Sequence, residues 1–349
     1  MEREPNPLHV PGLTIEELTD AVVALGEPVF RAKQILDWLY RKLVCDFTEM
    51  RNLPKTFLAE AATKLEICRA SVEDVFVSQD DTRKLLLRLH DGARIETVII
   101  PENERLTCCI SSQVGCGMGC VLCASGMFGL ERNLTAGEIV EQVLHAAKQA
   151  GRQPTHIVVM GIGEPLANYD AVLRAIKILN ADWAFNIAAR RITVSTVGIP
   201  DAIERLAGEQ LQVNLAISLH APNDMTRNQI VPANRRFGID KILHAGRHYF
   251  TKTGREITIE YALVAGMNDG IAAAEELARR LKGYPCTVNL IACNPVPELG
   301  VKPPPYAGVK QFLDVLHKRG IRATIRKPRG VEVGAGCGQL RAERVNRKR

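Results

Sequence analysis

The stretch Cys116-Gly-Met-Gly-Cys120-Val-Leu-Cys123 places three thiols within eight residues, at the spacing C-x3-C-x2-C. No fourth Cys or His follows in the sequence at a matching interval. Three thiolates can bind three irons of a 4Fe-4S cube and leave the fourth iron open to another ligand. A structural zinc site instead closes with four protein ligands, usually arranged as two pairs. The spacing therefore favours an iron–sulfur cluster with one open iron over zinc.

The composition is that of a globular protein. The chain has 349 residues, 46% hydrophobic and 24% charged, which is enough for one large barrel or for two domains. Its net charge of +6 is compatible with a nucleic-acid partner and equally with many other enzymes. Ten cysteines without a charged-then-apolar leader predict a reducing compartment, the cytoplasm, and metal-binding or catalytic thiols. No apolar stretch approaches about 18 residues, so we expect no membrane span.

Helix and strand patterns divide the chain. Residues 15–70 are predicted to be helical, opened by a capping box at Thr14-Ile-Glu-Glu17. Short strands follow, and from about residue 105 strands and helices alternate, which predicts an α/β fold with a parallel sheet, open or curled. The expected short strands are 75–77, 84–89 and 94–100; the strands of the alternating part are 106–111, 156–160, 192–196, 213–218, 256–263 and 287–291; its helices are 135–150, 168–180, 200–208, 239–252, 270–282 and 307–319.

Residues of unusual type gather where the predicted strands end. The cysteine loop follows the first strand of the alternating part, and Gly161-Ile-Gly-Glu-Pro165 follows the second. Ser195 ends the third strand, Ser218-Leu219-His220 ends the fourth, and Asn294 follows the sixth. The carboxyl ends of parallel strands share one rim, where barrels and open parallel sheets bind ligands. Their common position on that rim is a stronger signal than any one of these residues alone.

Several motifs together resemble those of a known family. The cysteine spacing is similar to that of radical S-adenosylmethionine (SAM) enzymes, in which SAM chelates the open iron. From about residue 15 to about residue 342, the motifs and their order resemble the RlmN/Cfr family of radical SAM RNA methyltransferases, in particular its RlmN members. These motifs are Thr107-Cys-Cys109-Ile-Ser-Ser-Gln-Val-Gly-Cys116, Arg132-Asn-Leu134, Gly161-Ile-Gly-Glu-Pro165, Ser218-Leu-His-Ala-Pro-Asn-Asp224 and Gly336-Cys-Gly-Gln-Leu340.

The resemblance implies a fold with several parts. The family fold is a partial (β/α)6 radical SAM barrel with a small N-terminal helical domain and a short β extension, which agrees with the pattern of elements described above. We therefore predict four divisions: a helical RNA-binding accessory domain at 1–72, a β-hairpin extension or linker at 73–104, the barrel at 105–340 and a basic tail at 341–349.

The resemblance also implies a reaction. RlmN enzymes methylate C2 of an adenosine in 23S rRNA, the adenosine-2503 type of site, and adenosine 37 of tRNA is a further candidate substrate. Cfr enzymes methylate C8 of the same rRNA adenosine. Pro165 and the motif Arg326-Lys-Pro-Arg329-Gly330 favour the RlmN type. Because C2 is a poor nucleophile, ordinary displacement on SAM fails there, and a radical supplied by the cofactor is needed.

The reacting thiols are assigned by the resemblance. Cys337 would take a methyl group from one SAM, and a second SAM bound to the cluster would supply the radical that activates this methyl group. After the carbon has joined C2, Cys109 would attack the sulfur of Cys337, release the product and leave a disulfide. Neighbours on a strand point to opposite faces, so only one of Cys108 and Cys109 can face the barrel interior. The residues alone leave that choice even.

The other site residues are assigned by matching positions. Glu96 matches the family glutamate proposed to accept the C2 proton, and Cys109 is the alternative acceptor. One departure is the run Gly334-Ala335-Gly336, because the family usually has a carboxylate there, which is either missing or replaced by Glu332. The matching cluster ligands are Cys116, Cys120 and Cys123, and the matching SAM contacts are Gly163, Glu164, Ser195, Ser218, Leu219, His220 and Asn294.

The expected partners follow from the same reading. They are 23S rRNA, tRNA as a further candidate, and an electron donor such as flavodoxin or ferredoxin, with the protein itself a monomer. Three alternatives stay open: a Cfr-like C8 enzyme, a radical SAM enzyme that does not methylate, and an iron–sulfur or zinc RNA-binding protein. The candidate phosphate contacts are Arg190-Arg191, Arg235-Arg236, Arg326-Lys327, Arg329 and the basic residues of 341–349.

Overall fold

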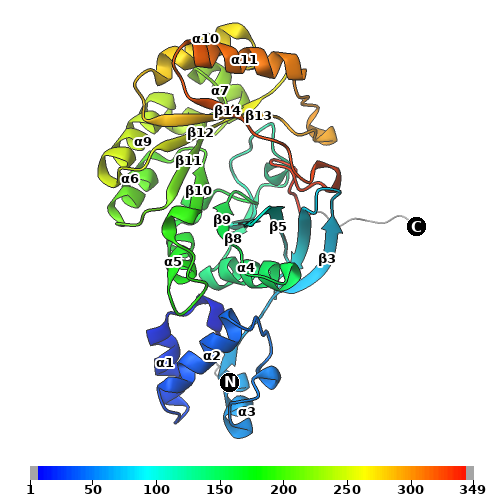
Figure 1. The fold of residues 1–349 in the computed structure, drawn as a ribbon, viewed down its shortest axis with the longest axis vertical. Coiled ribbons are helices and arrows are strands. Elements are labelled where there is room, and N and C mark those ends of the chain that lie inside the picture. The colour runs from blue at the N-terminus through cyan, green and yellow to red at the C-terminus, as the bar shows by residue number, and fades with distance from the viewer. Residues whose placement is uncertain (1–6, 343–349) are drawn as a thin grey trace, which may run out of the picture.

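A ten-stranded mixed sheet forms the centre of the computed structural model, which describes residues 7–342 (Figure 1). Its strand order is β14-β13-β12-β11-β10-β9-β6-β5-β4-β3, and the pairs from β6 to β14 are all parallel. The parallel strands are β6 (Arg105–Cys109), β9 (His156–Val159), β10 (Ile192–Thr196), β11 (Asn214–Ser218), β12 (Ile257–Leu263), β13 (Cys286–Ala292) and β14 (Ala323–Ile325). The predicted α/β fold with a parallel sheet is confirmed, and β14 adds a short edge strand that the sequence pattern did not predict.

Helices connect the parallel strands and cover the outer face of the sheet (Figure 1). The six predicted helices are α4 (Ala136–Ala150), α5 (Tyr169–Asn180), α6 (Pro200–Gly208), α9 (Ile239–Thr253), α10 (Ile271–Leu281) and α11 (Tyr306–Lys318). Two short helices after β11, α7 (Asp224–Ile230) and α8 (Asn234–Phe237), were not predicted, because neither is long enough to show a helical period. Within residues 7–342, no helix has the length and apolarity that a membrane span requires.

The antiparallel strands before the barrel continue the same sheet. They are β3 (Ser71–Val77), β4 (Arg83–Arg88) and β5 (Arg94–Glu102). β5 pairs with β6 so that Val98 lies opposite Cys109, and the hairpin is thereby hydrogen-bonded to the first barrel strand. Two small sheets complete the strands: β1 (Leu8–His9) with β2 (Leu65–Glu66), and β7 (Gln113–Gly115) with β8 (Leu130–Asn133).

The N-terminal helices form a lobe below α4 in Figure 1. They are α1 (Ile15–Ala24), α2 (Phe30–Tyr40) and α3 (Lys55–Lys64), and the predicted capping box between Thr14 and Glu17 opens α1. Tyr40 packs edge-on against Phe185 of the barrel, with 5.2 Å between ring centroids. Because α4 lies between this lobe and the sheet, every residue from 136 to 147 is buried. The domain limits at 72, 104 and 340 stay predictions, and the basic residues beyond 342 lie outside the described part.

Gly12 lets the N-terminal segment approach the backbone of α4. A Cβ at Gly12 would lie 2.9 Å from the backbone nitrogen of Gly137, which is closer than real Cβ atoms come. We expect Gly12→Ala to lower the free energy of unfolding by about 1–3 kcal/mol, because backbone cannot move aside as a side chain can. Thermal or denaturant unfolding measures this. The control is Gly208→Ala, since Gly208 has open space around it; equal stability of both variants would contradict the prediction.

Candidate active site

One cavity opens at the carboxyl rim of the parallel strands, where the sequence predicted a site. Residues from the cysteine loop, from the ends of β9 to β13 and from the C-terminal loop line it. Ten of the predicted site residues meet there: Cys116, Cys120, Cys123, Gly163, Glu164, Ser195, Ser218, His220, Asn294 and Cys337. Of the other predicted residues, Cys109 lines an adjoining cavity, whereas Glu96 and Leu219 are absent from both linings.

The three motif cysteines line the main cavity from one loop. Among the described residues, their Sγ atoms do not all lie within 4.8 Å of one another. Thiolates that share one zinc at about 2.3 Å would lie only about 3.8 Å apart, whereas each thiolate of a 4Fe-4S cube binds a different iron. Burial raises the pKa of all three thiols, that of Cys116 to about 11. The residues fit a three-thiolate cluster, and its binding must displace their protons.

Glu164 and Gly163 form the wall beside the cysteine loop. Gly163 has φ +106°, and a Cβ there would lie 2.6 Å from that of Gln113, so only glycine fits. The Glu164 carboxylate accepts backbone N–H bonds from Leu166 at 3.0 Å and from Val197 at 2.8 Å. Burial raises the pKa of Glu164, although these bonds favour its charged form. The carboxylate is thus fixed in place at the cavity wall.

His220 presents a neutral imidazole to the cavity. Burial, together with the nearby Arg227 guanidinium, lowers the pKa of His220 to about 3. Its Nδ1 accepts the backbone N–H of Ala262 at 3.0 Å, so the proton resides on Nε2, which can donate to a ligand. The backbone of His220 is left-handed, at φ +58°, and Asn268 holds its carbonyl at 2.7 Å. A non-glycine residue in this conformation is consistent with a functional position.

The remaining predicted contacts divide into two groups. The hydroxyls of Ser195 and Ser218 lie 3.3 Å apart on neighbouring strands, and both residues line the cavity. Asn294 also lines it and donates to the carbonyl of Cys337 at 2.9 Å, which ties the rim to the C-terminal loop. The side chain of Leu219 is instead buried in the hydrophobic core, so a side-chain contact from Leu219 to a ligand is not supported.

Cys109 and Cys337 meet at the smaller adjoining cavity. Cys109 faces inward beside Val98 and Val158, whereas Cys108 is fully buried in the core on the other face, so the structure decides the choice that the sequence left even. Cys337 is exposed and borders both cavities. Burial and the neighbouring Cys337 raise the pKa of Cys109 to about 12, so this group is a neutral thiol at physiological pH.

Glycines seat the Cys337 loop against the cysteine loop. Gly338 has φ +81°, and a Cβ there would lie 2.7 Å from the carbonyl oxygen of Leu122. The carbonyl of Gly338 accepts the N–H of Ala124 at 2.7 Å, and the Ser125 hydroxyl donates to the carbonyl of Leu340 at 2.6 Å. The glycines beside Cys337 therefore allow close backbone approach, a role that the sequence pattern had not revealed.

Two carboxylates anchor the C-terminal segment. Glu96 pairs with Lys84 at 2.9 Å and accepts the backbone N–H groups of Arg341 and Ala342 at 2.8 and 3.1 Å. Glu332 accepts hydrogen bonds from the Ser78 hydroxyl and from the backbone of Gln79, at the turn between β3 and β4. Glu332 is therefore engaged with this turn, where it holds the loop that leads to Cys337.

Three further residues line the main cavity, to which the sequence analysis had not assigned them. Arg326, predicted as a phosphate contact, lines both cavities, and the charges of Cys337 and Glu260 raise its pKa against the effect of burial. Glu260 also lines the main cavity, and burial raises its pKa. Cys293, to which the sequence analysis assigned no role, lines the cavity too. Glu260 could have been identified from the sequence, because a charged residue within a largely apolar strand such as β12 is unusual.

The fold and site define a radical SAM enzyme, and residues 110–281 match the family model of the radical SAM superfamily. Residues 9–67 match the model described as the ribosomal RNA large subunit methyltransferase N-terminal domain. The chain belongs to the RlmN family of radical SAM methyltransferases. Membership of the superfamily implies a 4Fe-4S cluster and SAM, which the donor set described above fits.

Relatives and a solved structure agree with this assignment. The chain is 46% identical to a probable dual-specificity RNA methyltransferase RlmN of Geobacillus thermodenitrificans, over 95% of this chain and 92% of that protein. It is 42% identical to a protein of the same name from Rhodopirellula baltica, over 97% and 92%. A crystal structure of a radical SAM methyltransferase from Sphaerobacter thermophilus superposes with a TM-score of 0.94 at 48% identity, covering 97% of this chain and all of that one.

The close approach at Gly338 can be tested by adding one methyl group. We expect Gly338→Ala to lower methyl transfer by about 10- to 100-fold, because the Cys337 loop must move away from the cysteine loop. The activity of the reconstituted enzyme measures this. Gly320→Ala is the matched control, because Gly320 shares the positive φ but has open space around it. A loss of the same size in both variants would trace the effect to backbone strain instead.

The two reacting thiols are expected to differ in reactivity. At about pH 8, a thiol with a pKa of about 12 is thiolate in a fraction on the order of 10⁻⁴, and Cys109 is also buried. We expect iodoacetamide to alkylate Cys337 at least about a hundredfold faster than Cys109 in reduced protein whose Cys337 is unmodified by intact mass. Peptide mass spectrometry over time measures both rates. Similar rates would contradict the burial of Cys109.

Proposed function

We propose that this enzyme methylates C2 of an adenosine in 23S rRNA, at the adenosine-2503 type of site, and accepts adenosine 37 of tRNA as a second substrate. The observation that carries the proposal is the pair of free thiols, Cys109 and Cys337, at one small cavity beside the three motif cysteines. The relatives' name, dual-specificity RNA methyltransferase, supports RNA as the substrate.

The paired thiols suit a methyl transfer that passes through the protein. When bound by Cys116, Cys120 and Cys123, the cluster supplies the electron for radical cleavage of SAM. Cys337 is exposed, so its sulfur can take a methyl group from another SAM and hold it as a thioether. Two SAM molecules are thus used per turnover, one for the methyl group and one for the radical.

Product release is the task of Cys109. Once the carbon on Cys337 has joined C2, the adduct radical would lose the C2 proton and return its unpaired electron to the cluster that supplied it. The sulfur of Cys109, as thiolate, then attacks the sulfur of Cys337. A sulfur–sulfur bond forms and the sulfur–carbon bond breaks. Its electron pair stays on the carbon attached to C2 of the adenine, and this carbon takes up a proton to become the methyl group. Arg326 lowers the pKa of Cys109 against the effect of burial, which favours the attacking thiolate. Electrons from a donor such as flavodoxin or ferredoxin then reduce the disulfide.

Glu96 is the proposed acceptor of the C2 proton, with Cys109 as the alternative. Glu96 is buried and bonded to Lys84 and to the backbone at 341–342, so acting as a base requires this segment to move away. Such movement would also widen the entrance for a nucleotide, since Leu340 lines the cavity of Cys109 and Cys337. Glu96 can therefore act first as the anchor of this segment and later as the base.

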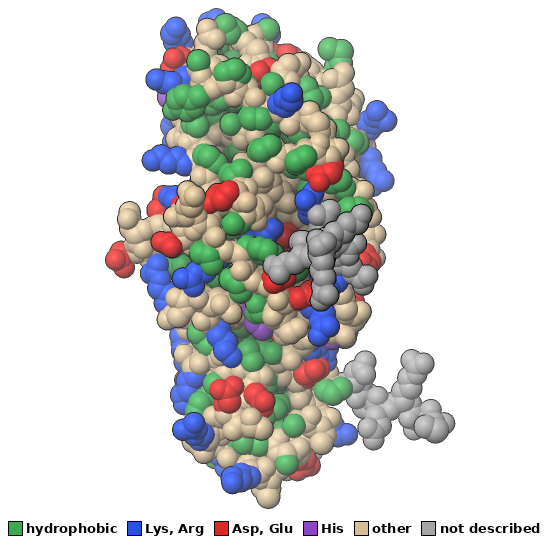
Figure 2. Space-filling view, turned by 90° about the vertical axis from the view of Figure 1, so that its right-hand side faces the viewer, with side chains coloured by type: hydrophobic (Ala, Val, Ile, Leu, Met, Phe, Trp, Pro, Cys, Tyr) green, Lys and Arg blue, Asp and Glu red, His purple; other side chains and the backbone are tan. Residues whose placement is uncertain are grey.

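RNA has to present an unstacked base to this cavity. Arg190, Arg191, Arg235 and Arg236 are all exposed and suit phosphate contacts, whereas Arg329 is already paired with Glu102. On the face drawn in Figure 2, basic side chains are interspersed with acidic and apolar ones. We propose that the N-terminal lobe helps to grip the RNA and that the enzyme acts as a monomer in the cytoplasm.

A Cfr-like enzyme acting on C8 is the second candidate, and nucleoside analysis separates the two. Anaerobically reconstituted enzyme, SAM, a reductant and an unmodified 23S rRNA fragment should yield 2-methyladenosine by mass spectrometry of the digested RNA. Cys337→Ala should form at least about a hundredfold less 2-methyladenosine, because no other residue carries the methyl group. Cys109→Ala should instead accumulate a covalent protein–RNA adduct.

The matched control is Cys108→Ala, because Cys108 neighbours Cys109 but is buried on the opposite face of the sheet. It should retain product formation. Appearance of 8-methyladenosine would replace the proposal by its C8 alternative. Formation of 5′-deoxyadenosine without any methylated base would contradict methyl transfer to this RNA.

A further inference from the structure

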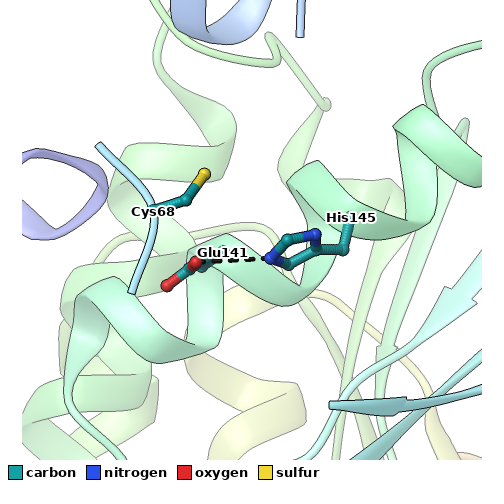
Figure 3. A group of neighbouring side chains, drawn as sticks. All are labelled: Cys68, Glu141 and His145. Atoms are coloured by element: carbon teal, nitrogen blue, oxygen red, sulfur yellow. Dashed lines mark hydrogen bonds and ion pairs between the residues drawn. The ribbon is translucent and has the colours of Figure 1, made fainter. Parts of the chain in front are cut away.

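A second group of metal-ligating side chains lies where the N-terminal lobe meets α4, away from the cavity. Cys68, Glu141 and His145 each offer a ligand atom, and these atoms all lie within 4.8 Å of one another (Figure 3). Glu141 and His145 stand on successive turns of α4, and Cys68 follows β2. Within residues 7–342 no other such group of three occurs.

Two further donors border this group. Cys45, in the loop after α2, lies near Cys68, His145 and Glu141, although its Sγ is not within 4.8 Å of all three of their ligand atoms. His9, at the end of β1, places its Nε2 3.0 Å from Oε2 of Glu141. Four segments far apart in the sequence thus bring two thiols, two imidazoles and one carboxylate to one place.

Buried polar atoms in this group lack hydrogen-bond partners. The side chains of His9 and Glu141 are 8% and 1% exposed. Among the described residues, both ring nitrogens of His9 and Oε2 of Glu141 have no partner in hydrogen-bond geometry, despite the 3.0 Å approach. Buried polar groups are satisfied in nearly all native proteins, so such atoms indicate a missing water or ion. The ring and the carboxylate are positioned for a further ligand.

We propose that Cys45, Cys68, Glu141 and His145 bind one structural zinc ion, with His9 supporting Glu141 from the second coordination layer. Two thiolates, an imidazole and a carboxylate are the donor types that zinc prefers, and four protein ligands close a structural site. Atoms bound to one zinc at about 2.0–2.3 Å lie about 3.3–3.8 Å apart, so binding draws the three preset donors together by small side-chain rotations. The Cys45 thiol, which does not lie within 4.8 Å of all three of these ligand atoms, has to move toward them to complete the tetrahedron.

The site would fasten the N-terminal lobe to the barrel. Cys45 and Cys68 belong to the lobe and the segment that leaves it, whereas Glu141 and His145 belong to the buried helix α4. The backbone N–H of Ala70 already binds Oε1 of Glu141 at 2.7 Å, which fixes the carboxylate. Lys148 also lies near Cys45 and opposes a cation, but its side chain is exposed and its charge is screened. The inference does not depend on the proposed RNA substrate.

The metal content of the cluster-loaded enzyme tests the proposal. We expect about one zinc per chain beside the full complement of cluster iron, by inductively coupled plasma mass spectrometry of protein purified anaerobically from zinc-containing medium. X-ray absorption at the zinc edge should give two sulfur neighbours at about 2.3 Å and two nitrogen or oxygen neighbours at about 2.0 Å. Because iron occupies the motif cysteines, this zinc cannot be the cluster site filled by the wrong metal.

Two variants should separate the metals. Cys68→Ser should lose at least about fivefold of the zinc and keep its iron, whereas replacing Cys116, Cys120 and Cys123 together by Ser should lose the iron and keep the zinc. Cys286→Ser, which alters a buried core cysteine outside both groups, should keep both metals. The proposal would be overturned by less than about a tenth of a zinc per chain, or by zinc that leaves with the motif cysteines. A Cys45–Cys68 disulfide in the anaerobic protein would also overturn it.

If Cys68→Ser fails to fold, the X-ray absorption spectrum of the unaltered enzyme at the zinc edge tests the proposed zinc site. A zinc with two sulfur neighbours supports the site proposed here, because His9, Glu141 and His145 supply none. A zinc with four or with no sulfur neighbours places the metal elsewhere and overturns the proposal.

Discussion

Parallel hydrogen bonding from β6 to β14 brings the functional groups of this protein together, because it brings the carboxyl ends of seven strands to one rim. Within this register Ser218 lies beside Glu260, and Glu260 lies beside Asn289. A slip of one residue would turn Glu260 from the cavity into the core, where its charge would have no partner. The apolar strands and the helices that cover them therefore fix the site as firmly as they fix the fold.

The C-terminal loop completes the cavity from the other side. It reaches the cysteine loop through contacts between residues more than 200 positions apart, such as Ser125 with Leu340. Close backbone approach is possible there because Gly338 lacks a side chain. Glu96 and Glu332 hold the two ends of this loop on β5 and on the β3–β4 turn. The antiparallel strands before the barrel thus carry the anchors of the reacting Cys337.

Spacing and surroundings distinguish the two groups of thiols. The motif cysteines lie on one loop and face the cavity, which suits a cluster whose open iron binds a ligand there. Cys68 instead lies against Glu141 and His145, with the ligand atoms close enough for one ion. Burial keeps His220 neutral, whereas the neighbouring Cys337 and Glu260 raise the pKa of the Arg326 guanidinium. Two sites of different chemistry can therefore exist in one chain.

The sequence by itself determined the α/β class, the six repeated strand–helix units, the capping box at Thr14 and the thiols that could bind a cluster, because each depends on residues close together in the chain. It did not determine which face of β6 Cys109 occupies, the burial of Leu219, the position of Arg326 on both cavities, the bonds of Glu96 to the C-terminal backbone, or the meeting of Cys45 and Cys68 with α4. These features arise from contacts between distant segments. Only the tertiary structure decides them, because the packing of the sheet and of α4, and no local pattern, sets which side chains meet.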